Sequence, residues 1–203
     1  ATQYESRAPT PSSDRGCSAL TVCAPSEAEA VAPTLTSDRR CTEEVAIVDS
    51  DLNGPVGIAI TPAGGELYMV EHGGKRVWHV NLTTNAKVSI RALDSQVYGC
   101  ALGNGGVLFV AEGTVNLVSK VELTSPYANS TAVSGLSKPV SVVLNETKTV
   151  MYVAELSAHQ VRRVCPNTGT TESSKEVAVS GITNAGGLAL SKDGSVLYVG
   201  QFA

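Results

Sequence analysis

The chain has 203 residues, 42% of them hydrophobic, with 15 Lys and Arg against 19 Asp and Glu and a formal charge of −4. The apolar content suffices for a sizeable core, and the charges form no basic run of the kind that binds DNA or RNA. The longest apolar stretches are strand-sized, far short of the roughly 20 residues that span a bilayer. The sequence therefore predicts neither a nucleic-acid partner nor a membrane span.

A polar, cysteine-rich tandem repeat occupies residues 1–43, which hold three of the five cysteines. It starts at Ala1 without a charged start and an apolar signal segment, so we interpret Ala1 as a processing boundary. Residues 1–17 and 25–41 match at an offset of 24, most clearly in the Ser-Asp-Arg sequences that lead to Cys17 and Cys41. We expect two small, loop-rich units that are too short to bury a core and are held by disulfides.

The register of this repeat suggests a disulfide pattern. Shifting Cys23 back by 24 residues places its counterpart before Ala1. If each unit closes a loop from its first cysteine to the one after Ser-Asp-Arg, Cys23 pairs with Cys41, and Cys17 pairs with a cysteine that precedes residue 1. The spacing also allows a local bond between Cys17 and Cys23, because connectivity does not follow from sequence alone.

The ending Thr36-Ser37-Asp38-Arg39-Arg40-Cys41 resembles the cysteine-rich modules of the tumour necrosis factor receptor type, and the resemblance extends over about 40 residues. The units here have fewer cysteines than the receptor modules. The resemblance therefore implies an extracellular repeat, and the ligand binding of that family is not carried over.

A second repeat runs from residue 44 to residue 203. Its four units are marked by aromatic residues that lie 41, 43 and 46 positions apart: Tyr68, Phe109, Tyr152 and Tyr198. In each unit a small apolar run precedes the aromatic run, and an alternating third run and a short fourth run follow in some units, for example at 76–80 and 87–90. Units of this length with four short strands are typical of β-propeller blades. The sequence predicts an all-β fold, a partial propeller of three full four-stranded antiparallel blades and half of a fourth after the disulfide-linked segment.

These units resemble NHL-type propeller blades over about 160 residues, in the Gly-Ile-Ala run at 57–59, the aromatic run and the later Arg-Val at 76–77. The resemblance implies a fold and not an activity, because such propellers serve enzymes, receptors and scaffolds. Propellers typically close with four to eight blades, so we interpret the chain as cut at Ala203. We expect residues 44–49 to form a strand that closes the ring on the last blade. The alternative is an open array whose edges pair with another copy in a filament.

Three carboxylates recur three positions after the aromatic residue, Glu71, Glu112 and Glu155, with Gln201 in the fourth unit. A catalytic or metal-binding group is needed once, whereas a residue that recurs in every blade usually serves the blade. We interpret the three carboxylates as structural groups of the blade, which could for instance accept hydrogen bonds from the next turn. The four aromatic residues are likewise expected in the core.

The histidines His72, His79 and His159 do not have metal-ligand spacing, and we predict no catalytic residue, no metal and no cofactor. One alternative is a calcium-dependent hydrolase that resembles the lactonase and strictosidine-synthase-like propellers. That resemblance would implicate four possible ligands, Asn53, Asn104, Asn184 and Asp193.

Modification and thiol chemistry are predicted from short motifs. Asn81, Asn129 and Asn145 begin Asn-x-Ser/Thr sequons at expected strand ends or turns, so covalent N-linked glycans are predicted there. Cys100 is expected to be a small buried hydrophobe. Cys165 is expected in an exposed turn with a partner outside this segment, since a bond between these two would span too great a distance.

Tandem repeats of two kinds, without a catalytic constellation, favour a non-enzymatic fragment of a secreted, extracellular structural or adhesive glycoprotein. Its propeller is expected to be an assembly or contact module, in a fibre or a surface appendage. The expected partners are other copies of the chain or other extracellular proteins. A carbohydrate- or protein-binding module is a further alternative, but one Trp, two Phe and six Tyr leave few aromatic rings for stacking on sugars.

Overall fold

The computed structural model describes residues 3–7, 16–23, 27–34, 37–38, 40–43, 51–166 and 176–202. The chain divides into two compact units, residues 1–48 and 49–203. The boundary expected at 43/44 and the closing strand expected at 44–49 both fall in residues 44–50, which lie outside the described ranges. Within those ranges the regular elements are β-strands, and no helix is long and apolar enough to cross a membrane.

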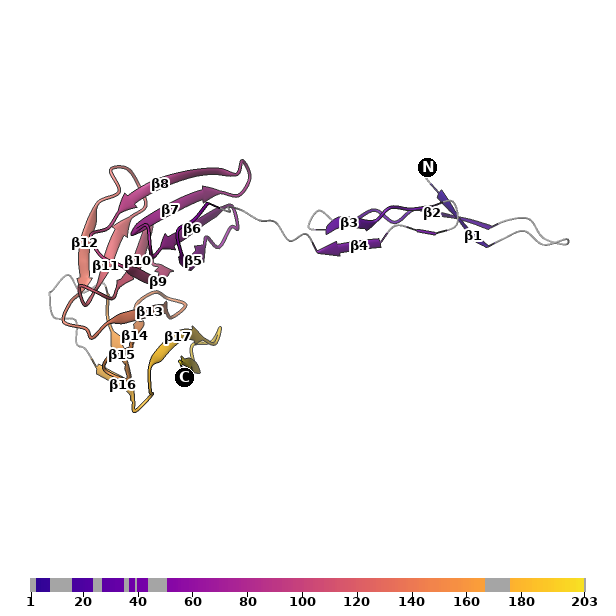
Figure 1. Ribbon diagram of the computed structural model, residues 1–203. Coiled ribbons are helices and arrows are strands. Elements are labelled where there is room, and N and C mark those ends of the chain that lie inside the picture. The colour runs from indigo at the N-terminus through magenta and orange to yellow at the C-terminus, as the bar shows by residue number, and fades with distance from the viewer. Residues whose placement is uncertain are drawn as a thin grey trace. The chain divides into compact units, whose positions relative to one another are not determined.

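The first unit consists of two antiparallel hairpins, β1–β2 and β3–β4 (Figure 1). The strands are β1 (Gln3–Arg7), β2 (Gly16–Ala19), β3 (Glu27–Val31) and β4 (Arg40–Glu43). Their registers are identical at an offset of 24: Glu5 lies opposite Cys17 and Glu29 opposite Cys41, and a bulge follows at the same place. The expected loop-rich units are therefore hairpins, because sequences such as Glu-Ala-Glu-Ala-Val have the two-residue alternation of a strand.

The second unit contains three four-stranded antiparallel sheets and one two-stranded sheet, in the orders β5-β6-β7-β8, β9-β10-β11-β12, β13-β14-β15-β16 and β17-β18. The strands of the first two sheets are β5 (Pro55–Ile60), β6 (Glu66–Glu71), β7 (Arg76–Asn81), β8 (Ala86–Ala92), β9 (Val97–Leu102), β10 (Val107–Glu112), β11 (Leu117–Glu122) and β12 (Asn129–Val133). The remaining strands are β13 (Pro139–Leu144), β14 (Met151–Glu155), β15 (Gln160–Val164), β16 (Glu176–Ser180), β17 (Ala185–Leu190) and β18 (Leu197–Gln201). This arrangement confirms the predicted partial propeller of three full blades and half of a fourth.

The first strand of each sheet lies on the inside of the array, and the fourth strands β8, β12 and β16 lie on its outside (Figure 1). The inner strands contact one another in chain order, β5 with β9, β9 with β13 and β13 with β17. Glycine makes this close approach possible. A Cβ at position 57 would lie 2.8 Å from the carbonyl oxygen of Tyr98, and one at position 99 would lie 2.9 Å from the Cα of Ser141. The small apolar runs of the sequence are therefore inner strands.

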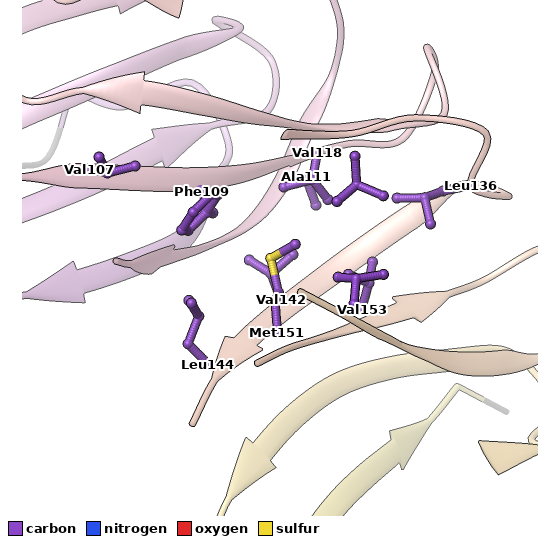
Figure 2. Packing of buried hydrophobic residues seen from close by; sticks show 11 residues of the cluster. Val107, Phe109, Ala111, Val118, Leu136, Val142, Leu144, Met151 and Val153 are labelled. Carbon is purple, nitrogen blue, oxygen red and sulfur yellow. The ribbon is translucent and has the colours of Figure 1, made fainter. Parts of the chain in front are cut away.

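Apolar side chains fill the spaces between successive sheets. One cluster lies between the first and second sheets and includes Tyr68, Val77 and Leu108. A second cluster lies between the second and third sheets, where Phe109 packs with residues that include Val142 and Met151 (Figure 2). The first three sheets thus bury their facing surfaces against one another, which is the packing expected of propeller blades.

The four repeating aromatic residues do not share one environment. Tyr68 and Phe109 are buried, as expected, but Tyr152 is only half-buried and Tyr198 is 60% exposed. The expectation that all four lie in the core is therefore wrong for Tyr198. Phe109 is covered by the sheet that follows its own, whereas no described sheet follows β17–β18.

Alanine substitutions at two inner-strand glycines test the close approach of the backbones. Gly99→Ala should lower the free energy of unfolding by about 1–3 kcal/mol, because the new Cβ meets the backbone of β13 and one strand has to move. Gly187→Ala is the matched control and should change it by less than about 0.5 kcal/mol, since no heavy atom lies within 4 Å of its Cβ position. Urea unfolding followed by the fluorescence of Trp78 measures both, and equal losses would contradict the account.

Candidate functional site

The recurring carboxylates Glu71, Glu112 and Glu155 lie at the ends of β6, β10 and β14 and are at most 4% exposed. Each accepts hydrogen bonds from the segment that precedes the first strand of its own sheet. Each also accepts one from a residue seven positions later, on the third strand. The donors therefore differ from the expected next turn, and the carboxylate ties three segments of one sheet together.

The donors differ between the sheets. Glu155 accepts from the backbone N–H of Ser137 at 2.6 Å, from Gln160 Nε2 at 2.6 Å and from Arg162 Nε at 2.5 Å. Its negative charge is thus balanced by a guanidinium. In the first sheet, Glu71 accepts from the backbone N–H of Asn53 and, at 3.1 Å, from the indole N–H of Trp78.

Glu112 accepts hydrogen bonds from two serine hydroxyl groups. Ser95 Oγ donates to its Oε2 at 2.7 Å, and Ser119 Oγ donates to its Oε1. A pocket of about 260 Å³ opens beside this carboxylate. Its lining is Asp94, Glu112, Val115, Leu117, Ser119, Asn129, Ser130 and Thr131. The pocket therefore carries two carboxyl groups and no basic side chain.

Exposed apolar side chains mark the first sheet. On β5, Ile58 is 68% exposed and Ile60 is 54% exposed. Ile58 lies opposite Met69, which lies opposite Trp78, so these three side chains share one face. Lys87 lies over the Trp78 ring, with its Nζ 4.5 Å from the ring centroid. We call the surface formed by Ile58, Met69 and Trp78, together with Val56, the first-sheet face.

A second apolar surface lies on the two-stranded sheet. Tyr198 and Phe202 are 60% and 58% exposed, and Val196 is exposed as well. We call these three residues the last-sheet face. Neither surface was recognised in the sequence, because the repeat pattern does not distinguish Ile58 and Tyr198 from Val142 and Phe109, which occupy equivalent positions and are buried.

The histidines and the four possible metal ligands have partners within the chain. His72 Nδ1 lies 2.9 Å from the carbonyl oxygen of Val97, His79 contacts Glu66, and His159 Nδ1 accepts from the backbone N–H of Asn184. Among the other possible ligands, Asn104 Nδ2 donates to the carbonyl oxygen of Thr147 at 2.9 Å, and Asp193 Oδ1 accepts from Ser191 Oγ at 2.6 Å. Asn53 is engaged through its backbone N–H, which donates to Glu71. Among the described residues, no group of three or more His, Cys, Asp or Glu side chains is placed to hold a metal ion.

The cysteines have distinct environments. Cys100 carries a free thiol and packs beside the first core cluster, and loss of solvent raises its pKa to about 12. Cys165 follows β15 directly and is half-buried. Cys23 forms a disulfide. The side chains of Cys17 and Cys41 lie outside the described part of the chain, so the pairing of Cys23 with Cys41 stays a prediction.

The three sequons lie at strand ends. Asn81 ends β7, Asn129 begins β12 and Asn145 follows β13 directly. The amide of Asn81 donates to Glu66 Oε1 at 3.2 Å, and that of Asn145 donates to Thr147 Oγ1 at 2.9 Å. Asn129 is exposed on the outer strand. Glycosylation at these positions stays a prediction.

No protein-family profile matches the chain, and no curated protein matches it. Solved structures do match its fold. A chain of the nidogen/laminin complex matches with a TM-score of 0.65 at 14% identity, over 80% of this chain and 60% of that one. The β-propeller domain of Cps50 (Swd1) from Myceliophteria thermophila matches with a TM-score of 0.59 at 17% identity, over 74% and 50%.

An enzyme has the same fold. A catalytically inactive virginiamycin B lyase from Staphylococcus aureus, solved with quinupristin, matches with a TM-score of 0.58 at 14% identity, over 72% of this chain and 48% of that one. These likenesses show a β-propeller fold and no activity. The chain spans 48% to 60% of the length of these three solved chains.

Removing the carboxylate of the third sheet tests its structural role. Glu155→Ala should lower the free energy of unfolding by about 3 kcal/mol, because Gln160, Arg162 and the backbone N–H of Ser137 lose their fully buried acceptor. Glu176→Ala removes an exposed carboxylate 3.6 Å from Arg163 and should cost at most about 1 kcal/mol. Chemical unfolding measures the difference, and similar losses in the two variants would contradict the role assigned to Glu155.

Proposed function

We propose that this chain is a non-catalytic contact module of an extracellular structural or adhesive protein, and that its propeller sheets assemble with those of another copy. The observation that carries this proposal is the exposure of the first-sheet face. Ile58 and Val142 occupy the same register position, opposite Met69 and Val153 on the second strands. Val142 is 5% exposed beneath the preceding sheet, whereas Ile58 is 68% exposed. The first-sheet face therefore has the same register position exposed that a preceding sheet covers in the third sheet.

The last-sheet face offers the complementary surface. Tyr198 occupies the position of Phe109, which packs against the sheet that follows its own and is 2% exposed. A head-to-tail contact would place Tyr198 of one copy against Ile58 of another, as successive sheets pack within the chain. Burying one large apolar side chain contributes about 1.5–3 kcal/mol, so several together support an association.

The fold supports protein contact as well. One of the similar chains comes from the nidogen/laminin complex, and the chain spans 60% of its length. Within the described part of the second unit there are three four-stranded sheets and one two-stranded sheet. The exposed faces of the first and the last of these sheets are the surfaces assigned to the contact with a second copy.

The assembly is tested by the mass of the particle formed by the full chain in solution, measured by sedimentation over a range of concentrations. Ile58→Lys and Tyr198→Lys should each weaken self-association by about tenfold or more, since a charge cannot be buried there unpaired. Val177→Lys, on the exposed outer strand β16, is the matched control. A mixture of the two end-face variants should restore one contact, because each retains the surface that the other lacks.

A chain that stays monomeric at all concentrations would contradict the assembly proposal. Equal weakening of self-association by Val177→Lys would contradict it as well. If mixing the Ile58→Lys and Tyr198→Lys variants restored no complex, the head-to-tail arrangement would be contradicted.

The extracellular part of the proposal is supported by the disulfide of Cys23, because such bonds persist in oxidising compartments. Peptide mass mapping of non-reduced native material should find Cys23 linked to Cys41. It should also find sugar mass on at least one of Asn81, Asn129 and Asn145. Reduced Cys23 together with three bare asparagines would contradict an extracellular role.

A further inference from the structure

The pocket beside Glu112 lies where the other two sheets place a large side chain. Ser119 lies opposite Val110, Arg162 lies opposite Val153 and Trp78 lies opposite Met69. In each case the second-strand residue precedes the recurring glutamate by two positions. Ser119, Arg162 and Trp78 are therefore equivalent, and the short serine leaves open a volume that the arginine and the tryptophan occupy in their own sheets.

A second donor is also replaced. Glu112 lies opposite Leu117 on the third strand, and Glu155 lies opposite Gln160 in the same way. Gln160 Nε2 donates to Glu155 at 2.6 Å, whereas the side chain of leucine has no donor. The second sheet therefore has the carboxylate but neither of the two side-chain nitrogen donors that accompany it in the third sheet.

The charge of Glu112 is consequently balanced by no cation in the pocket. The side chain is 4% exposed and accepts from the hydroxyls of Ser95 and Ser119. Asp94 adds a second, exposed carboxyl group to the lining, which contains no Lys, Arg or His. Arg91 of β8, whose Nε is buried without a hydrogen-bond partner, is not among the lining residues. A poorly solvated carboxylate binds a cation more strongly than one in water.

We propose that this pocket binds the guanidinium of an arginine side chain presented by a peptide or protein. The third sheet supplies the template, since Arg162 Nε donates to Glu155 Oε2 at 2.5 Å from the equivalent position. The planar guanidinium donates two parallel hydrogen bonds to a carboxylate, which an ammonium does not. Val115 and Leu117 provide apolar lining for the methylene groups of an arginine. This site is independent of the two end faces.

The test uses the full chain and the peptide acetyl-Gly-Arg-Gly-amide, followed by the backbone amide resonances of Ser119 and Thr131. Saturable shifts should appear with this peptide. The citrulline peptide, which has the same shape without the charge, and the lysine peptide should each bind at least tenfold more weakly. Ser119→Arg should abolish the shifts by filling the pocket from within, whereas Ser180→Arg, on exposed β16, introduces the same charge and should leave binding unchanged.

Asp94→Asn changes an exposed side chain, so the fold is kept, and it should weaken arginine binding several-fold. Unchanged affinity in Asp94→Asn, equal binding of the citrulline or lysine peptide, or the absence of saturable shifts would each overturn the proposal, even if Ser119→Arg failed to fold. Ile58→Lys should bind the arginine peptide as tightly as the original chain, which separates this site from the proposed assembly contact.

Discussion

The burial of apolar sheet faces against one another is the constraint on which the second unit depends. Each four-stranded sheet is apolar on both faces, so it needs a neighbour on each side. The glycines at positions 57 and 99 let the inner strands approach closely enough for those faces to meet. Among the described residues, Ile58 on the first sheet and Tyr198 on the two-stranded sheet are exposed, whereas Val142 and Phe109 at equivalent positions are buried. Fold and proposed contact thus have one physical origin.

The recurring glutamate shows how one repeated element acquires local differences. In all three sheets it joins the entering segment to the third strand. The residue seven positions later is Trp78, Ser119 or Arg162. The charge beside the glutamate and the volume filled by this side chain therefore differ between the sheets. In the third sheet the charge of Glu155 is balanced by Arg162 of the same sheet. The second sheet has the carboxylate and an open pocket, and this difference suggests a binding site.

The repeat spacing and the alternation of small, aromatic and mixed runs predicted the first two strands of all four units and some of the outer strands, because each blade is a local unit with its own turns. The strands β11, β12 and β16 were not located individually. Burial was harder to predict. Tyr198 has the same sequence context as Phe109, and its exposure depends on a neighbouring sheet rather than on local sequence. The hairpins of the first unit were hidden by the turn-forming residues between their strands. The pocket depends on the volume of a single side chain, Ser119, which becomes visible only once the register is known.

The central claim is that the two end faces bind one another between copies. Amide hydrogen exchange of the full chain, measured at low and high protein concentration, tests it most directly because it reports on each strand separately. The account predicts that exchange slows at high concentration in β5 and β18, the strands of the two end faces, while β10 and β14 are unchanged. Exchange in β5 and β18 that is independent of concentration, or slowing confined to other strands, would contradict it.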